Sequence, residues 1–129
     1  MVRALRGLGF PQAERRALAG IHDLGDITGC PGIVWEVKAG AAAKTASDGQ
    51  IDAWLAETEA ERVNARADVG VLVTARAGIG ALNADRWWAH VPVGFSHETT
   101  TGFPVRMTLA NACSMLRFAG YGEPVEVAA

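Results

Sequence analysis

The run Val69-Gly70-Val71-Leu72-Val73-Thr74 is the feature that most constrains the fold. It is continuous, apolar and rich in β-branched residues. It lacks the alternating apolar and polar residues of a strand that has one solvent-exposed face. Such runs are typical of strands that are covered on both faces of a sheet. We therefore predict that residues 69–74 lie in the centre of a sheet.

Strand and helix patterns alternate around this run. Residues 33–39 are β-rich and follow a Cys-Pro-Gly turn sequence, which predicts a hairpin with residues 24–29. A helix is predicted to run from an N-cap at Ser47 or Asp48 to about Arg66. The remaining predicted elements are a loop at 75–85, a strand at 86–93, a polar loop at 97–102, a helix with N-cap Thr108 that stops at Gly120, and a frayed tail at 123–129.

Length and composition fit one globular domain. The chain has 129 residues, of which 50% are hydrophobic and 20% charged, enough to bury a real core. We predict a single α/β domain spanning 1–129, with a central mixed sheet of about four or five strands flanked by helices.

Several classes of protein are not indicated. No segment reaches the roughly 18 uninterrupted apolar residues of a membrane span, and no signal peptide is recognisable. Cys30 and Cys113 form no CxxC motif, so we predict two packing residues in a cytoplasmic protein rather than a zinc site or disulfide. Gly78-x-Gly80 lacks the rest of a phosphate-cradling loop, so no nucleotide cofactor is expected.

Other residue types give weaker signals. His22, His90 and His97 share no spacing suited to metal ligation on one element, and none is a candidate site residue. Trp87 and Trp88 must point to opposite sides of their strand, so one is expected in the core. The other could stack on an unpaired base or lie in an interface.

The segment Glu36-Val37-Lys38, which begins ten residues after Asp26, carries the chemistry. Alternation along the strand places Glu36 and Lys38 on one face, and Asp26 on the neighbouring strand comes close enough for both carboxylates to meet one ion. Hard oxygen ligands suit Mg²⁺, which takes one or two carboxylates and keeps several waters. The plain alternative is a solubilising Glu-Lys pair on the wet face of a strand.

The stretch GDITGCPGIVWEVKAG, with the following helix that contains Gln50 and Trp54, resembles the PD-(D/E)XK nuclease superfamily, and within it a Holliday-junction-resolvase-like branch from actinobacterial phages and prophages. The resemblance also covers GFPQAERRALAG, IDAWLAETEAERVNARAD, GVLVTARAG, RWWAHVPV and MTLANACSMLRFAGYG, which together make up most of the chain in order.

The resemblance implies a restriction-endonuclease-like fold and roles for individual residues. Asp26 and Glu36 would be metal ligands, with the main-chain carbonyl of Val37 as a further ligand. Lys38 would be the catalytic lysine, and Gln50 an additional active-site residue. Mg²⁺ would be the cofactor, with Mn²⁺ as a substitute, and the substrate would be DNA, most plausibly branched. Symmetric cleavage of a junction needs two active sites, which implies a homodimer.

The chain departs from the family pattern in two places. Gly25 stands where the nominal motif has proline. The N-terminal helix is short, and the Glu that relatives carry on it has no counterpart. Either Glu14 completes the metal site, or the chain starts downstream of its natural beginning, or two carboxylates hold the metal alone.

Charge is unevenly distributed along a chain whose net charge is −2. Residues 1–22 contain four arginines and one acid, Glu14, and Arg6, Arg15 and Arg16 are the predicted DNA contacts. The acids gather instead in the predicted helix, where we expect them on a solvated back face; they are Asp48, Asp52, Glu57, Glu59 and Glu61.

These observations predict a metal-dependent DNA endonuclease. Two alternatives stay open: a restriction- or repair-type nuclease that cuts ordinary duplex, and a DNA-binding or structural protein that keeps the fold without turnover.

Overall fold

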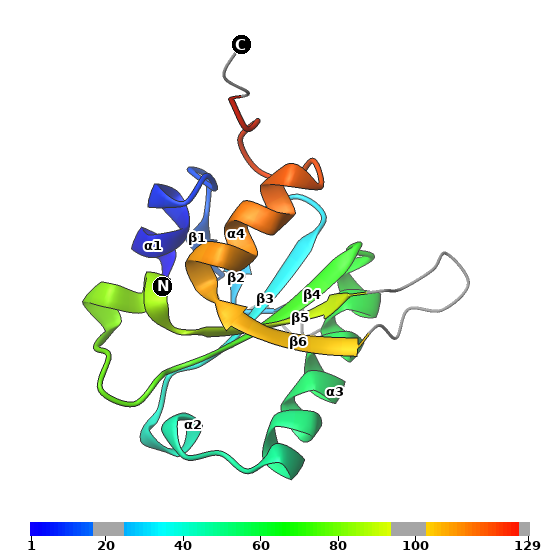
Figure 1. Ribbon diagram of the computed structural model, residues 1–129. Coiled ribbons are helices and arrows are strands. Elements are labelled where there is room, and N and C mark those ends of the chain that lie inside the picture. Colours follow the sequence, from blue (N-terminus) through cyan, green and yellow to red (C-terminus); the bar gives the residue numbers. More distant parts are fainter. Residues whose placement is uncertain (17–24, 94–102, 127–129) are drawn as a thin grey trace.

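The computed structural model describes residues 1–16, 25–93 and 103–126 (Figure 1). In chain order the elements are α1 (Val2–Gly7), β1 (Glu14–Arg15), β2 (Ile27–Thr28), β3 (Ile33–Lys38), α2 (Ala41–Lys44), α3 (Asp48–Ala65), β4 (Val69–Thr74), the 3₁₀ helix η1 (Ala81–Arg86), β5 (Trp88–Val93), β6 (Phe103–Thr108) and α4 (Leu109–Phe118). Among these residues no helix is both long and apolar enough to span a membrane.

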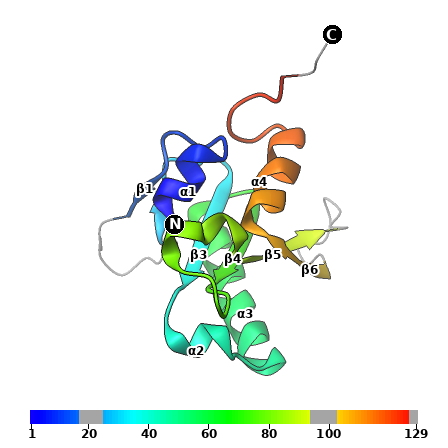
Figure 2. The same cartoon turned by 60° about the vertical axis from the view of Figure 1, so that its left-hand side comes forward.

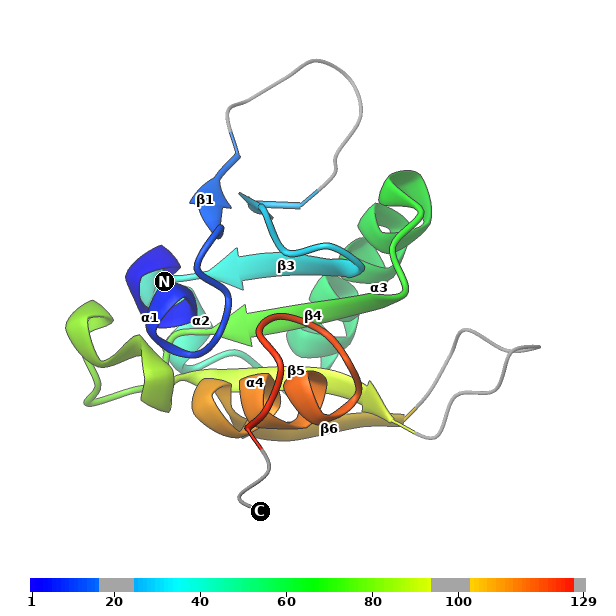
Figure 3. The same cartoon turned by 90° about the horizontal axis from the view of Figure 1, so that it is seen from above.

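Four strands form a mixed sheet in the order β3-β4-β5-β6. Strands β3 and β4 are parallel and are joined by α3, whereas the other two pairs are antiparallel. All six residues of β4 are buried, so the prediction of a central strand is confirmed. The chain is a small α/β domain, and a separate antiparallel pair, β1-β2, lies beside the β3 edge (Figure 3).

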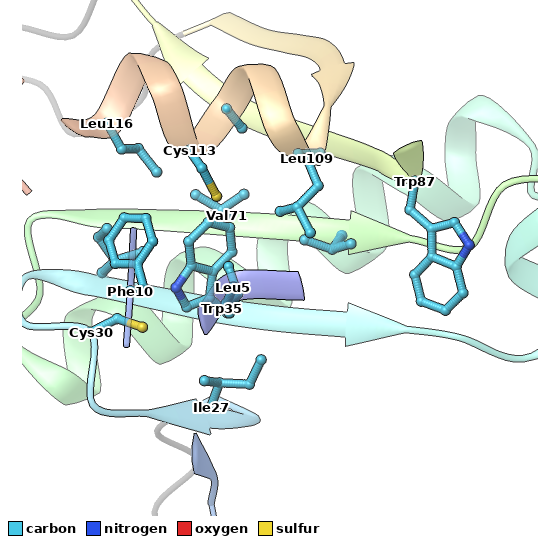
Figure 4. Close-up of a cluster of buried hydrophobic side chains, with 14 of the residues drawn as sticks. Leu5, Phe10, Ile27, Cys30, Trp35, Val71, Trp87, Leu109, Cys113 and Leu116 are labelled. Carbon is cyan, nitrogen blue, oxygen red and sulfur yellow. The ribbon is translucent and has the colours of Figure 1, made fainter. Parts of the chain in front are cut away.

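Helices cover the two faces of the sheet differently (Figures 1 and 2). Helices α1 and α4 lie on one face, over a dry core in which Phe10 meets Trp35 edge to face at a centroid distance of 5.9 Å (Figure 4). Helix α3 covers the opposite face at close range. A Cβ at Gly70 would lie 3.1 Å from Cγ2 of Thr58 and 3.2 Å from its carbonyl oxygen, so glycine permits this approach.

The helix predictions are confirmed at their caps. The Ser47 side chain accepts a hydrogen bond from the backbone of Gln50 at 3.1 Å at the start of α3. Thr108 does the same for Asn111 at 3.2 Å at the start of α4. Past the end of α4, Gly120 has φ of +103°, a conformation that glycine adopts without strain.

The predicted hairpin is only partly formed. Strand β2 has two residues and its regular partner is β1, with Arg15 opposite Ile27; residue 24 lies outside the described residues. The link to β3 is made just before β2, where the Asp26 N–H donates to the Trp35 carbonyl at 3.0 Å. The chain therefore bends away from β3 after this one hydrogen bond between their backbones.

Three further features differ from the predictions. Strand β6 was not predicted, because it contains Pro104 and is largely exposed, as is typical of an edge strand. Part of the predicted loop at 75–85 forms η1. The predicted frayed tail is anchored at its start, where Glu123 N–H donates to Gly9 at 2.8 Å. Its residues 127–129, like the predicted loop at 97–102, fall in segments that the structure does not describe.

Candidate active site

Strand β3 presents Glu36 and Lys38 toward α3, while Trp35 enters the core and Val37 packs against it. This arrangement is the one that alternation predicts. Nζ of Lys38 lies 3.2 Å from Oε1 of Glu36. Glu36 is 7% exposed and Lys38 is half-buried. The pair is therefore not a solvent-exposed surface pair, although Lys38 still reaches solvent.

Helix α3 supplies partners from the other side. Trp54, Glu57, Thr58 and Glu61 recur at helical spacing and share one face of the helix. Nζ of Lys38 lies 3.1 Å from Oε2 of Glu57 and 5.7 Å from the centroid of the Trp54 ring. Burial lowers the pKa of Lys38, but its hydrogen bonds to Glu57 and Glu36 outweigh burial, so the pKa is raised and the amine stays charged.

Asp26 is fixed against β3 by two hydrogen bonds. Its backbone N–H donates to Trp35, and its Oδ2 accepts from the Val37 N–H at 2.8 Å. The preceding Gly25 has φ of +89°, and a Cβ there would lie 2.7 Å from Cγ1 of Val34. Glycine at the nominal proline position thus lets the chain pass tightly beside β3 and places Asp26 next to Glu36.

The electrostatics of Glu36 follow from this crowding. Burial raises the pKa of its carboxyl group, and the negative charge of Asp26 raises it further. Interaction with the Glu61 carboxyl and with Lys38 acts in the opposite direction without cancelling the rise. A cation placed between Asp26 and Glu36 would stabilise the ionised carboxylate of Glu36.

Sequence reasoning missed Glu61 and Glu57. Both were expected on a solvated back face, but Glu61 is 2% exposed and lies beside Glu36, and Glu57 pairs with Lys38. Asp48 and Asp52 are exposed, as predicted for this group, and the half-buried Glu59 pairs with Arg62 at 2.7 Å. The signal available in the sequence was the helical spacing of Trp54, Thr58 and Glu61.

Gln50 and Glu14 are not brought into the cluster. Gln50 shares the helix face of Trp54 and Glu57 but lies two turns before Glu57, about 10 Å along the axis, and its side chain is exposed. Glu14 is exposed on β1 opposite Thr28. Within the described parts of the chain, no hydrogen bond or ion pair joins either side chain to Asp26 or Glu36.

The predicted DNA-binding arginines lie along the β1 side of the site. Arg16 N–H donates to the Asp26 carbonyl at 2.8 Å, which brings its backbone beside the site. Arg15 is exposed on β1. Arg6 is exposed on α1, where its Nε donates to Ala13 at 2.9 Å.

The residues present are compatible with a weakly held divalent cation. Oε2 of Glu36 is buried, its carboxyl group interacts with that of Glu61, and the Asp26 carboxylate lies close to it. No described group of three or more His, Cys, Asp or Glu side chains is arranged to hold a metal. Mg²⁺ is commonly held by only one or two protein carboxylates, the number that Asp26 and Glu36 offer.

The chain was compared with family models, curated proteins and solved structures. No match was found in any of them.

Proposed function

We propose that this protein is a Mg²⁺-dependent DNA endonuclease that hydrolyses phosphodiester bonds in branched DNA. The observation that carries the proposal is the position of Lys38, whose Nζ lies 3.2 Å from the buried Glu36 carboxylate, beside Asp26. The two carboxylates can hold a metal that activates a water, and the amine beside them can offset charge that develops on a phosphodiester.

The proposed roles follow from the environment of each group. Asp26 and Glu36 would hold Mg²⁺, which supplies an activated water and polarises the phosphoryl oxygen when bound. Mn²⁺ would substitute for it. Lys38, kept charged by its two carboxylate partners, would orient the attacking water or offset charge that develops on the phosphate.

Glu57 has a different role in this account. It is 55% exposed at its side chain and holds Nζ of Lys38 at 3.1 Å. An approaching phosphate competes for the same amine, so Glu57 would release Lys38 when substrate binds. Gln50, on the same helix face, would contact substrate rather than metal.

The branch preference and the dimer rest on the resemblance to the PD-(D/E)XK resolvase-like proteins. The same resemblance implies a restriction-endonuclease-like fold, with DNA contacts at Arg6, Arg15 and Arg16. It also adds a location in the cytoplasm, that of the bacterial host for a phage-encoded enzyme. A nuclease that cuts ordinary duplex would use the same Asp26, Glu36 and Lys38, so substrate choice must be measured.

The test is cleavage of end-labelled four-way junction, linear duplex and single strand in Mg²⁺ and in Mn²⁺. We expect paired symmetric cuts confined to the junction, and their loss in Asp26→Asn. Equal cutting of every duplex would replace the resolvase assignment with a general nuclease. Binding of DNA without cleavage of any substrate would contradict the enzymatic proposal and support a DNA-binding or structural role.

A further inference from the structure

A second group of positive side chains lies on the α3 side of the sheet. Thr74 pairs with Trp88 across β4 and β5, and His90 pairs with Arg106 across β5 and β6. These residues line a pocket of about 590 Å³ between the sheet, α2 and the start of α3. Its remaining lining residues include Lys44 and Arg76.

Trp88 holds two guanidinium groups in place. Cζ of Arg76 lies 4.0 Å from the centroid of the Trp88 ring, and Cζ of Arg106 lies 4.4 Å from the same centroid. Stacking on an indole fixes the plane of a guanidinium and leaves the N–H donors at its edge available. Arg76 uses one donor for the Arg86 carbonyl at 3.3 Å.

The charges of this pocket are not neutralised locally. Three cations, Lys44, Arg76 and Arg106, line it against one acid, Asp48, and no ion pair to any of the three occurs in the parts of the chain that the structure describes. His90 adds no charge at neutral pH, because burial and the neighbouring Arg106 lower its pKa. Its Nε2 lies 3.2 Å from the Thr74 hydroxyl.

We propose that the pocket formed by Arg76, Trp88 and Arg106 binds the phosphate group of a phosphate ester. Two guanidinium groups held against one ring in the same pocket offer more N–H donors than the two oxygens of a carboxylate require, and a phosphate presents more acceptor oxygens. Lys44 adds a third positive charge to the lining. The inference stands without the hydrolytic activity proposed above.

The pocket is separate from the cluster at Glu36. Lys38, Thr74 and Trp88 form one row across three neighbouring strands, so Trp88 lies about 10 Å from Lys38. A phosphate here would not compete with a metal at Asp26 and Glu36. The ester could come from a free nucleotide or from the backbone of a nucleic acid strand, and both present the same chemistry.

The test is a nuclear magnetic resonance titration that follows the Trp88 indole N–H and the arginine Nε–H signals. Inorganic phosphate, a deoxynucleoside 5′-monophosphate and a short single-stranded oligonucleotide are added in turn at constant ionic strength. We expect phosphate-dependent shifts at Trp88, Arg76 and Arg106. Equal affinity for the monophosphate and the oligonucleotide would identify a free nucleotide as the ligand. Much tighter binding of the oligonucleotide would identify a nucleic acid strand as the ligand.

Variants separate a built site from general positive charge. Arg106→Gln should weaken phosphate binding about tenfold, the loss of one charge-assisted hydrogen-bonded partner. Arg106→Lys keeps the charge but loses the fork, and should weaken binding as well. Arg3→Gln, an equal loss of charge on exposed α1, is the matched control and should bind as the wild type does.

Two outcomes would overturn the proposal. One is the absence of any phosphate-specific shift at Trp88. The other is an equal loss of binding in Arg3→Gln and Arg106→Gln. Unchanged signals from the other three tryptophans verify that each variant is folded.

Discussion

Nζ of Lys38 lies 3.1 Å from Oε2 of Glu57, so a hydrogen-bonded ion pair joins β3 to α3 at the candidate site. We predict that Glu57→Gln lowers the pKa of Lys38, because this hydrogen bond is the main contribution that raises it. The free energy of unfolding should fall by less than about 1 kcal/mol, since the Glu57 side chain is 55% exposed and solvent screens the pair.

The measurement is a magnetic resonance titration of the lysine side chains. The chain has only two lysines, and Lys44 serves as the internal control. An unchanged pKa of Lys38 in Glu57→Gln would show that the pair does not persist in solution.

Glu36 gives a prediction about pH and stability. Its pKa is raised in the folded state above the ordinary value of 4.5, so the folded protein binds the proton more tightly than the unfolded chain. The stability that this proton contributes is complete below about pH 4.5 and is lost as pH rises through the folded pKa. Chemical unfolding of Glu36→Gln should therefore show a smaller fall in the free energy of unfolding over this range than the wild type shows.

Glu59→Gln is the matched control for that comparison, because Glu59 pairs with Arg62 away from β3. A wild-type pH dependence that survives intact in Glu36→Gln would mean that another group causes it.

Much of the fold was predictable because its signals are local. Three kinds of signal each specify structure within a few residues: the apolar run of β4, the N-caps Ser47 and Thr108, and the turn before β3. Strand β6 was not predictable in the same way. Its apolar residues are exposed and include Pro104, so only pairing with β5 makes it a strand.

The residues of the candidate site likewise fall into those fixed by local sequence and those fixed by long-range packing. Glu36, Lys38 and Asp26 were predicted to meet because they lie close in the sequence around one turn. Glu61 comes from a helix whose position over the sheet depends on long-range packing. Its burial beside Glu36 therefore could not be inferred from its charged neighbours.

Gly70 tests the close packing of α3 on the sheet. Gly70→Ala places a Cβ 3.1 to 3.2 Å from two atoms of Thr58, so α3 must move away from β4. We predict a loss of about 1–3 kcal/mol in the free energy of unfolding, the usual cost of overpacking.

Gly49→Ala is the control for Gly70→Ala. Gly49 lies in the first turn of α3, where the nearest atom to an added Cβ is 3.9 Å away, so alanine should be neutral or slightly stabilising. Denaturant unfolding of both variants measures the difference, and equal stability of the two would contradict the close approach.

The two cysteines should be unreactive in the folded protein. Cys30 and Cys113 are both buried, and burial raises the pKa of Cys113 to about 12. Since only the thiolate reacts readily, a thiol reagent at pH 8 should label neither residue until the protein unfolds. Rapid labelling under native conditions would show that the core between β3 and α4 opens frequently.

We propose that Asp26, Glu36 and Lys38 together carry out the hydrolysis of DNA. The most direct test is single-turnover cleavage of the preferred DNA substrate in Mg²⁺ by the wild type, Glu36→Gln and Glu59→Gln. We predict at least a ~100-fold lower rate for Glu36→Gln and a wild-type rate for Glu59→Gln. Cleavage by Glu36→Gln at the wild-type rate would contradict this account, and so would the absence of cleavage by the wild type.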